Sequence, residues 1–208
     1  MTEPTACWNC GQDVVPDALF CGACNSLQPP PRNYYALLGF EREFLILDLK
    51  DLEARFYALS RQLHPDRFGR KSERERQYSL DASSVLNDAY RTLRNPISRA
   101  EYVLKRQGVD IGEPGSKNVP PELLEEVFEL NMALEELKTG DDSVRPQLRT
   151  ELGKFLDMLG AADRQMERQA AAWDQTNAPA ALAELRGILN RRKYIQNLVG
   201  EVERALAA

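Results

Sequence analysis

Hydrophobic residues recur at helical spacing through the middle of the chain. One such stripe predicts an amphipathic helix with a single buried face, and it consists of Leu49, Leu52, Phe56, Leu59 and Leu63. Asp48 is suited to cap the start of this helix. Pro65 disfavours the helical conformation at His64, so we expect the helix to end there. The polar stretch 66–76 is then predicted to form a loop.

A second helix is predicted from about Glu75 to Leu93, where Asn95-Pro96 ends it. Its inner face mixes apolar, small and polar residues: Leu80, Ser83, Ser84, Asn87, Ala89, Tyr90 and Leu93. Two long helices joined by a short loop are typical of an antiparallel hairpin. A helical turn at 34–38, ended by Gly39, precedes this hairpin, and a further helix at 97–107 follows it.

Amphipathic helices also account for the C-terminal part of the chain. Apolar positions mark helices over about 123–137, 144–173 and 182–206, and the second stripe includes Phe155, Leu156 and Leu159. The segment 108–121 contains three glycines and three prolines, which indicates a domain boundary. The pattern predicts a mainly α fold in which the helical hairpin is followed by a three-helix bundle.

The first 28 residues are predicted to form a separate small module. Pro29-Pro30-Pro31 is stiff and cannot continue a helix, so it is typical of a spacer. We therefore divide the chain into a module at 1–28, a linker at 29–33, a hairpin domain at 34–107, a second linker at 108–121 and a C-terminal domain at 122–208.

All four cysteines lie in this module, as the pairs Cys7-x2-Cys10 and Cys21-x2-Cys24, which ten residues separate. Two thiolates with this spacing can bind one ion from a tight turn, so four predict a closed tetrahedral site with a structural role. Zinc, one ion per chain, is favoured because it is the usual structural metal of four thiolates, while iron would use the same ligands. Paired disulfides are disfavoured in a reducing cytoplasm.

Composition and charge narrow the function further. The chain is 28% charged and 43% hydrophobic, which excludes a mainly disordered protein, and no apolar run is long enough to cross a membrane. Met1–Ala6 lacks a basic start and an apolar stretch, so we expect a cytoplasmic protein, or a mitochondrial matrix protein if a leader has been removed. The net charge of −5 disfavours nucleic acid as a partner. It therefore argues against the alternative of a zinc-dependent redox or nucleic-acid-binding protein.

The tripeptide His64-Pro65-Asp66 follows the first long helix. Proline fixes the turn, while the imidazole and the carboxylate project from it as donor and acceptor. The plain alternative is that His64 caps the helix and Asp66 begins a polar turn. His64 is the only histidine and has no cysteine or oriented serine nearby, so we expect that the protein is not an enzyme.

The motifs around this tripeptide resemble those of the J-domain. Tyr34-Tyr35-x-Leu37-Leu38-Gly39 precedes it, and Asn87-Asp88-Ala89-Tyr90-Arg91-Thr92-Leu93 follows it. The resemblance implies that the hairpin stimulates ATP hydrolysis by a DnaK/HscA-class chaperone. The implied chaperone-binding residues are His64, Pro65, Asp66, Arg55, Arg61 and Arg67. Any one of these arginines can equally belong to a solvated helix face.

The cysteine module, the junction Arg99-Ala100-Glu101-Tyr102-Val103-Leu104 and the acidic helix after residue 121 resemble the HscB-type iron–sulfur cluster co-chaperones. This resemblance implies that the bundle holds an IscU-type scaffold protein. The implied client-binding residues are Leu124, Phe128, Glu129, Met132, Glu136 and Tyr194. Glu125 stands where the family usually has an apolar residue, and Met132 where it often has a glutamate. The alternative is a general J-domain co-chaperone for misfolded clients.

Overall fold

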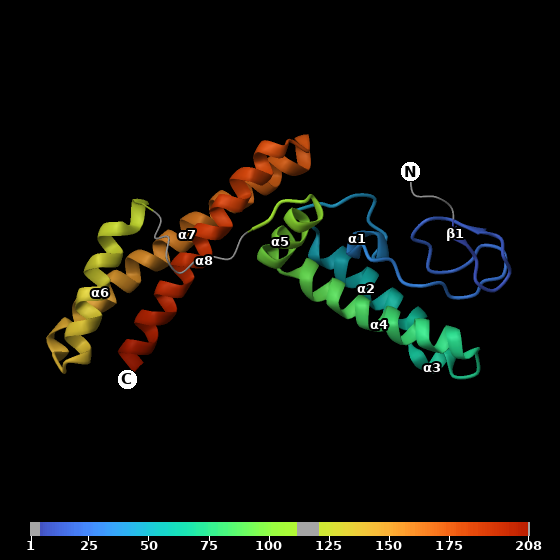
Figure 1. Ribbon diagram of the computed structural model, residues 1–208, viewed down its shortest axis with the longest axis horizontal. Coiled ribbons are helices and arrows are strands. Elements are labelled where there is room, and N and C mark those ends of the chain that lie inside the picture. Colours follow the sequence, from blue (N-terminus) through green and yellow to red (C-terminus); the bar gives the residue numbers. More distant parts are fainter. Residues whose placement is uncertain (1–4, 112–120, 208) are drawn as a thin grey trace. The chain divides into compact units, whose positions relative to one another are not determined.

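The computed structural model describes residues 5–111 and 121–207, and the chain divides into two compact units, 1–102 and 103–208. Most of the described residues are helical, which confirms the predicted mainly α class (Figure 1). Residues 112–120 of the predicted second linker lie outside the described residues. No described helix is long and apolar enough to cross a membrane.

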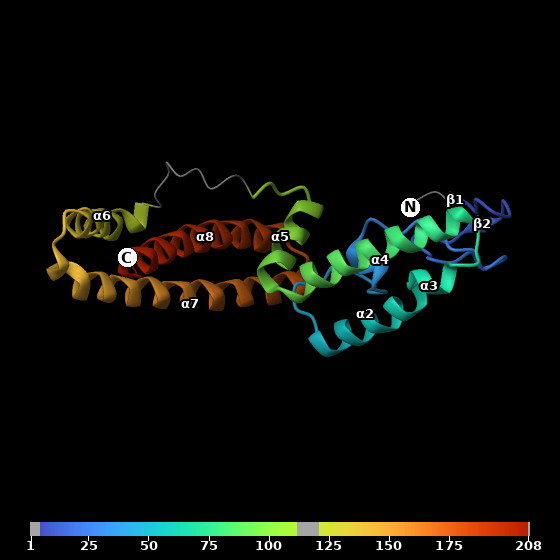
Figure 2. The same ribbon diagram turned by 90° about the horizontal axis from the view of Figure 1, so that it is seen from below.

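The helical hairpin forms the larger part of the first unit. Helix α2 (Leu49–Leu63) and helix α4 (Glu73–Arg94) run side by side (Figure 2), and the short helices α1 (Tyr34–Leu37) and α3 (Pro65–Phe68) pack on α4. Asp48 caps α2, as predicted, by accepting hydrogen bonds from two backbone N–H groups of its first turn. The core of the hairpin includes Leu52, Leu63, Ala82, Leu86 and Leu93.

The predicted loop at 66–76 is largely wrong, because α3 occupies its start and α4 begins within it at Glu73. Pro65 supplies the fixed backbone angle that suits the first position of α3. Ser72 then caps α4: its hydroxyl accepts from the Glu75 N–H at 3.3 Å and donates to the Glu75 carboxylate at 3.1 Å. This serine and glutamate, three residues apart, form a variant of the capping box.

Three leucines that the helical patterns placed on buried faces are exposed instead: Leu49, Leu80 and Leu156. Leu49 is the first residue of α2, at the end of the helix. Leu80 is adjacent to the fully buried Ser79 and Leu156 to the fully buried Phe155, so each points about 100° away from the packed face. On α4 the small residues Ser79 and Ala82 are buried, whereas Leu80 and also Ser84 and Asn87 of the predicted inner face are exposed. The periodicity alone does not show this choice.

The cysteine module begins with a two-stranded antiparallel sheet of β1 (Thr5–Ala6) and β2 (Asp13–Val14). A further bridge pairs Phe20 with Leu27. The module buries few apolar side chains: its cluster consists of Cys7, Val14 and Cys21, with Ala18 and Cys24 packed against it.

Helix α5 (Pro96–Arg106) is followed by Gly108, whose φ of +74° suits a glycine just after the end of a helix. The second unit is the predicted three-helix bundle, formed by α6 (Leu124–Lys138), α7 (Arg145–Thr176) and α8 (Pro179–Ala207) (Figure 2). The 3-10 turns Pro121–Leu123 and Asp142–Val144 precede α6 and α7. The bundle core includes Leu130, Leu148, Phe155, Ile195 and Val202, all buried.

Candidate metal centre and partner-binding surfaces

The four cysteine sulfur atoms lie within 4.8 Å of one another. The Sγ atoms of Cys7 and Cys24 are 3.7 Å apart, and those of Cys10 and Cys21 are 3.8 Å apart. A tetrahedron with metal–sulfur bonds of about 2.3 Å has edges of about 3.8 Å, whereas a disulfide needs about 2.05 Å. The sulfur positions therefore fit one metal ion and not paired disulfides, and the predicted tetracysteine site is confirmed.

Polar groups around Cys7 and Cys24 favour the thiolate forms of these two residues. Burial raises the pKa of Cys7, but hydrogen bonds from the Ser26 hydroxyl and from backbone N–H groups outweigh it and lower this pKa to about 5. The Ser26 hydroxyl, 3.0 Å from the Cys24 Sγ, is also the main cause of the lowered pKa of Cys24. The Gln28 amide donates to the Cys7 Sγ at 3.4 Å. Such donors orient metal ligands and stabilise the charge of four thiolates around a divalent ion.

The pKa of Cys10 is shifted in the opposite direction from that of Cys7. The backbone N–H of Gln12 lowers its pKa, but the neighbouring thiols and burial outweigh this and raise the pKa to about 12. Because thiolates are the forms that bind a metal, metal binding at this cluster must be accompanied by the release of protons. Four sulfurs at these spacings would fill the tetrahedron around one ion and leave no coordination position open.

Trp8, between the first two cysteines, attaches the module to the hairpin domain. Its indole N–H donates to the Leu27 carbonyl at 2.7 Å, inside the module. Its ring meets the Tyr78 ring edge-on, with centroids 6.2 Å apart, and the Arg74 guanidinium lies 5.1 Å over it. Both partners belong to α4, so the module packs beside that helix through an aromatic and a cation–π contact.

The His-Pro-Asp tripeptide forms an exposed turn between α2 and α3. His64 ends α2 and caps α3, and its Nδ1 accepts from the Asp66 N–H at 3.3 Å. The imidazole and the Asp66 carboxylate are 56% and 89% exposed. Capping thus uses one nitrogen of His64 and leaves most of both side chains open to a partner.

Two serines of α4 support this turn from beneath. The Leu63 carbonyl, at the end of α2, accepts from the Ser79 hydroxyl at 2.6 Å and from the Ser83 hydroxyl at 3.3 Å. Pro65 has no N–H, so the end of α2 depends on side-chain donors for its last carbonyls. Sequence reasoning placed Ser83 on the inner face but missed Ser79, and the spacing alone carries no signal for this bond.

The arginines assigned to chaperone binding differ in their surroundings. Arg61 and Arg67 are exposed on either side of the His-Pro-Asp turn. Arg55 instead bonds within the domain: its guanidinium donates to the Gly39 carbonyl at 2.6 Å, pairs with Asp51 at 2.9 Å and lies 4.5 Å over the Phe40 ring. Gly39 has a φ of +73°, and a Cβ there would come within 3.2 Å of Arg55. These contacts indicate that Arg55 holds the turn between α1 and α2.

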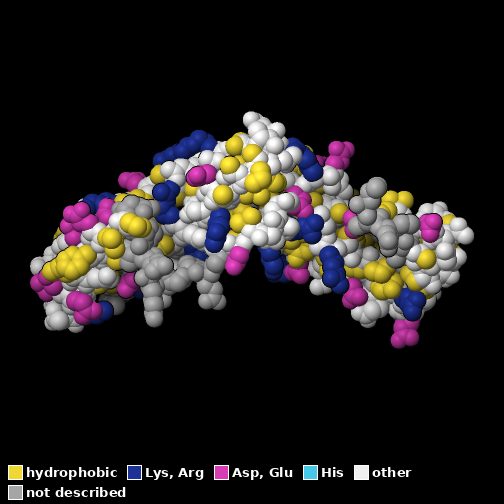
Figure 3. Space-filling view, turned by 45° about the horizontal axis from the view of Figure 1, so that its top comes forward, with side chains coloured by type: hydrophobic (Ala, Val, Ile, Leu, Met, Phe, Trp, Pro, Cys, Tyr) yellow, Lys and Arg dark blue, Asp and Glu magenta, His cyan; other side chains and the backbone are white. Residues whose placement is uncertain are grey.

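Three residues of the predicted client face form an exposed apolar stripe along α6. Leu124, Phe128 and Met132, one turn apart, are 56%, 65% and 51% exposed, while Glu129 and Glu136 are exposed beside them. Figure 3 shows hydrophobic side chains gathered among acidic ones at the end of the bundle where α6 lies. Tyr194 of α8 is partly buried against the bundle core, and this burial raises its pKa.

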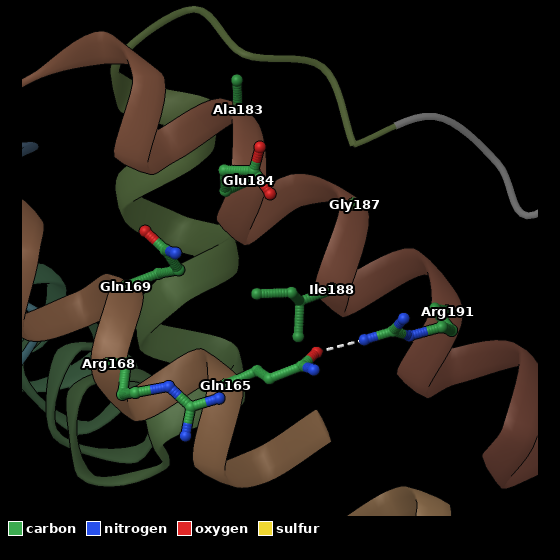
Figure 4. A pocket seen from close by; sticks show the side chains of 8 residues that line it. All are labelled: Gln165, Arg168, Gln169, Ala183, Glu184, Gly187, Ile188 and Arg191. Carbon is green, nitrogen blue, oxygen red and sulfur yellow. Dashed lines mark hydrogen bonds between the residues drawn. The ribbon is translucent and has the colours of Figure 1, made fainter. Parts of the chain in front are cut away.

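A hollow of about 640 Å³ lies between α7 and α8. Gln165 and Arg168 line one side, Glu184 and Arg191 the other, and Ile188 lies between them (Figure 4). The Arg191 guanidinium is bound to the Gln165 amide oxygen. Cysteine, serine and histidine are absent from the residues that line this hollow.

Comparison with known proteins matches this architecture. The DnaJ domain family matches residues 33–102. The iron–sulfur cluster co-chaperone protein HscB of Mus musculus is 34% identical over 172 residues, which cover 79% of this chain and 73% of the mouse protein. The co-chaperone protein HscB homolog of Vibrio atlanticus is 34% identical over 171 residues, which cover 82% of this chain and 95% of that protein. The chain belongs to the HscB family of co-chaperones.

The likeness to HscB extends to the solved fold. The crystal structure of human co-chaperone protein HscB matches with a TM-score of 0.71 and 28% identity, covering 96% of this chain and 98% of the human one. The DnaJ match ends at Tyr102, where the first compact unit also ends. Tyr102 closes that unit by stacking on Tyr34, with ring centroids 4.5 Å apart, and its hydroxyl accepts from the Tyr34 N–H at 2.9 Å.

The junction motif that resembled HscB has a physical role in the same unit. Arg99 is buried, and its guanidinium donates to the Leu45 carbonyl at 2.8 Å and to the Leu93 carbonyl. It therefore ties the loop before α2 to the end of α4. The sequence marked Arg99 as part of a family motif, but only the structure shows which carbonyls it satisfies.

Proposed function

We propose that this HscB-family chain is a co-chaperone in iron–sulfur cluster assembly, in the cytoplasm or the mitochondrial matrix. In this proposal a J-domain at 34–107 stimulates ATP hydrolysis by a DnaK/HscA-class chaperone. The C-terminal domain at 122–208 holds an IscU-type scaffold protein. The chain activates a partner's ATPase and catalyses no reaction of its own.

The exposed His64-Pro65-Asp66 turn is the observation that carries this proposal. The turn is preorganised, because Pro65 fixes its backbone and Ser79 holds the end of α2 beneath it. Little ordering is then needed when the imidazole and carboxylate meet a partner. Arg61 and Arg67 place positive charge on either side, which suits an acidic surface on the ATPase and speeds association with it.

The exposed stripe on α6 supports the assignment of the client surface. An apolar ridge with carboxylates beside it offers an aromatic anchor, Phe128, and an acidic rim. A chain that binds the scaffold and the ATPase chaperone at the same time raises the effective concentration of the scaffold near the chaperone. The separate surfaces on the two units make such simultaneous binding the simplest mode of action.

We further propose zinc as the metal of Cys7, Cys10, Cys21 and Cys24, one ion per chain. The sulfur spacings suit it, and a module with so small a core needs a metal to fold. Iron would use the same sulfurs, so the metal content of protein purified without chelator distinguishes the two. The bound ion would supply structure and no catalytic step.

An ATPase assay tests the central proposal. A cognate DnaK/HscA-class chaperone should hydrolyse ATP faster with this chain, and faster still when the IscU-type scaffold is added. His64→Gln should abolish stimulation and leave helical content and scaffold binding intact, because the side chain is exposed. Full stimulation by His64→Gln would overturn the J-domain assignment. If the chain binds a denatured client as tightly as it binds the scaffold, it is instead a general co-chaperone.

A further inference from the structure

The first unit also has a pocket, which lies beside the His-Pro-Asp turn and between the cysteine module and the hairpin. It has a volume of about 390 Å³. Phe20 and Asn25 of the module form one wall, and Gln62, Arg67 and Lys71 of the hairpin form the other. The Trp8 contacts with α4 hold the module in the position that creates this pocket.

The pocket is basic. Arg67 and Lys71 are exposed, and no described residue forms an ion pair or hydrogen bond with either side-chain cation. Glu75 also lines the pocket, but it is buried and its carboxylate accepts from Ser72. Two unpaired cations therefore line the pocket together with one carboxylate, so the lining carries a net positive charge. Such a site suits a carboxylate-bearing segment of a partner.

The pocket is also continuous with the His-Pro-Asp turn. Gln62 precedes His64 by two residues, and Arg67 follows Asp66 directly. A protein that binds the turn therefore has residues of the pocket lining next to its binding site. Asn25 presents its amide there from a left-handed backbone conformation with a φ of +55°, and the partly buried Phe20 adds an aromatic surface.

We propose that the cysteine module is part of the chaperone-binding surface. Phe20 and Asn25, together with Lys71, bind an acidic segment of the same ATPase chaperone that contacts His64 and Asp66. The inference rests on the proposed function and extends it: the metal holds a second wall of the docking site in place, in addition to folding the module.

Stimulation curves of the full-length, metal-loaded chain on the ATPase chaperone test this proposal. Lys71→Glu should raise the concentration for half-maximal stimulation about fivefold at low salt, and the difference should shrink at high salt. Lys50→Glu is the matched control, because Lys50 is exposed on α2 about 21 Å from His64 along the helix axis. It should leave the curve unchanged.

Asn25→Gly tests the module itself. Glycine tolerates the positive φ, so only the side chain is lost, and the half-maximal concentration should rise about twofold with metal content unchanged. Phe20→Ala should have a larger effect, and metal content shows whether the module is still folded. With p-benzoyl-phenylalanine in place of Phe20, irradiation should cross-link the chain to the ATPase chaperone.

The outcomes distinguish a failure of the proposed function from a failure of the proposed role of the cysteine module. If His64→Gln still stimulates, the proposed function itself fails. If His64→Gln abolishes stimulation while Lys71→Glu and Asn25→Gly behave like Lys50→Glu, only the role of the module fails. Cross-linking of position 20 to the scaffold, or to a second copy of this chain, in place of the ATPase chaperone would also overturn it.

Discussion

The cysteine module and the C-terminal bundle are stabilised in opposite ways. The module buries a cluster of three residues, two of which are metal ligands, whereas the bundle buries a cluster of thirteen. In the module, the bonds of four cysteines to one metal ion would fix the fold, and these cysteines are easily recognised because they lie close together in the sequence. In the bundle, stability is distributed over many packing contacts, none of which is individually visible in the sequence. The two regions should therefore fail differently.

The sharpest way to test this difference is to remove the metal. Structural zinc contributes about 10–16 kcal/mol to the folding of small modules, far more than the apolar cluster here can replace. Cys10→Ser or chelation should unfold residues 5–28 and leave the helical signal of the bundle unchanged. Circular dichroism with metal analysis measures this. Val15→Ser, at an exposed position of the same module, should keep the metal, and a folded module without metal would contradict the prediction.

A large-to-small change in the bundle tests the other half of the comparison. Leu130 is fully buried on α6, so Leu130→Ala should lower the free energy of unfolding of the bundle by about 3 kcal/mol. Metal content should not change. Met132→Ala, at an exposed position of the same helix, serves as the control and should cost far less in denaturant titrations. Equal destabilisation by both would mean that α6 is not packed as described.

The exposed stripe of α6 should matter for binding and not for stability. Phe128→Ala combined with Glu129→Ala should weaken scaffold binding by at least about 2 kcal/mol, a hot-spot magnitude, while unfolding stays unchanged because both side chains are exposed. Calorimetry measures the affinity. Leu80→Ala with Asp81→Ala, an exposed pair of similar type in the hairpin, is the control. Unaltered affinity, or an unfolded bundle, would require another client face.

The smallest expected effect concerns the support beneath the His-Pro-Asp turn. Ser79→Ala removes a buried hydrogen bond to the Leu63 carbonyl and should cost the hairpin about 1–2 kcal/mol. Stimulation of the partner's ATPase should fall as well, because the turn loses its fixed position. Ser84→Ala, exposed on the same helix, should do neither. If the two variants give the same thermal and ATPase data, Ser79 does not position the turn.

Local chemistry made much of the site predictable. The cysteine spacing predicted a tetracysteine cluster, the proline after His64 predicted the end of α2, and the motifs around them indicated the family. The apolar stripes predicted three bundle helices, and α7 and α8 begin and end within three residues of the expected bounds. Each of these inferences depends on residues close together in the chain, where spacing alone sets the geometry.

Other features depended on contacts between distant segments. The resemblance assigned Arg55 to chaperone binding, which stays a prediction, and only the structure shows that this side chain also bonds to Gly39 and Asp51. Leu80 was expected to be buried, but Ser79 and Ala82 face α2 instead. Ser72 and Glu75 were a readable capping signal that the polar composition of 66–76 obscured. Trp8 carried no signal of its contact with Tyr78, 70 residues away in the chain.

The sequence by itself determined the elements whose cause is local: the long helices, the end of α2, the four cysteines of the candidate metal site and the exposed His-Pro-Asp turn. The tertiary structure decided which face of each helix is packed, how serines of α4 support the end of α2, and where the cysteine module lies beside the hairpin. The physical reason is that spacing along the chain fixes which side chains share a helix face or a turn. Which faces meet depends on the shape and polarity of surfaces that come together only when the chain folds.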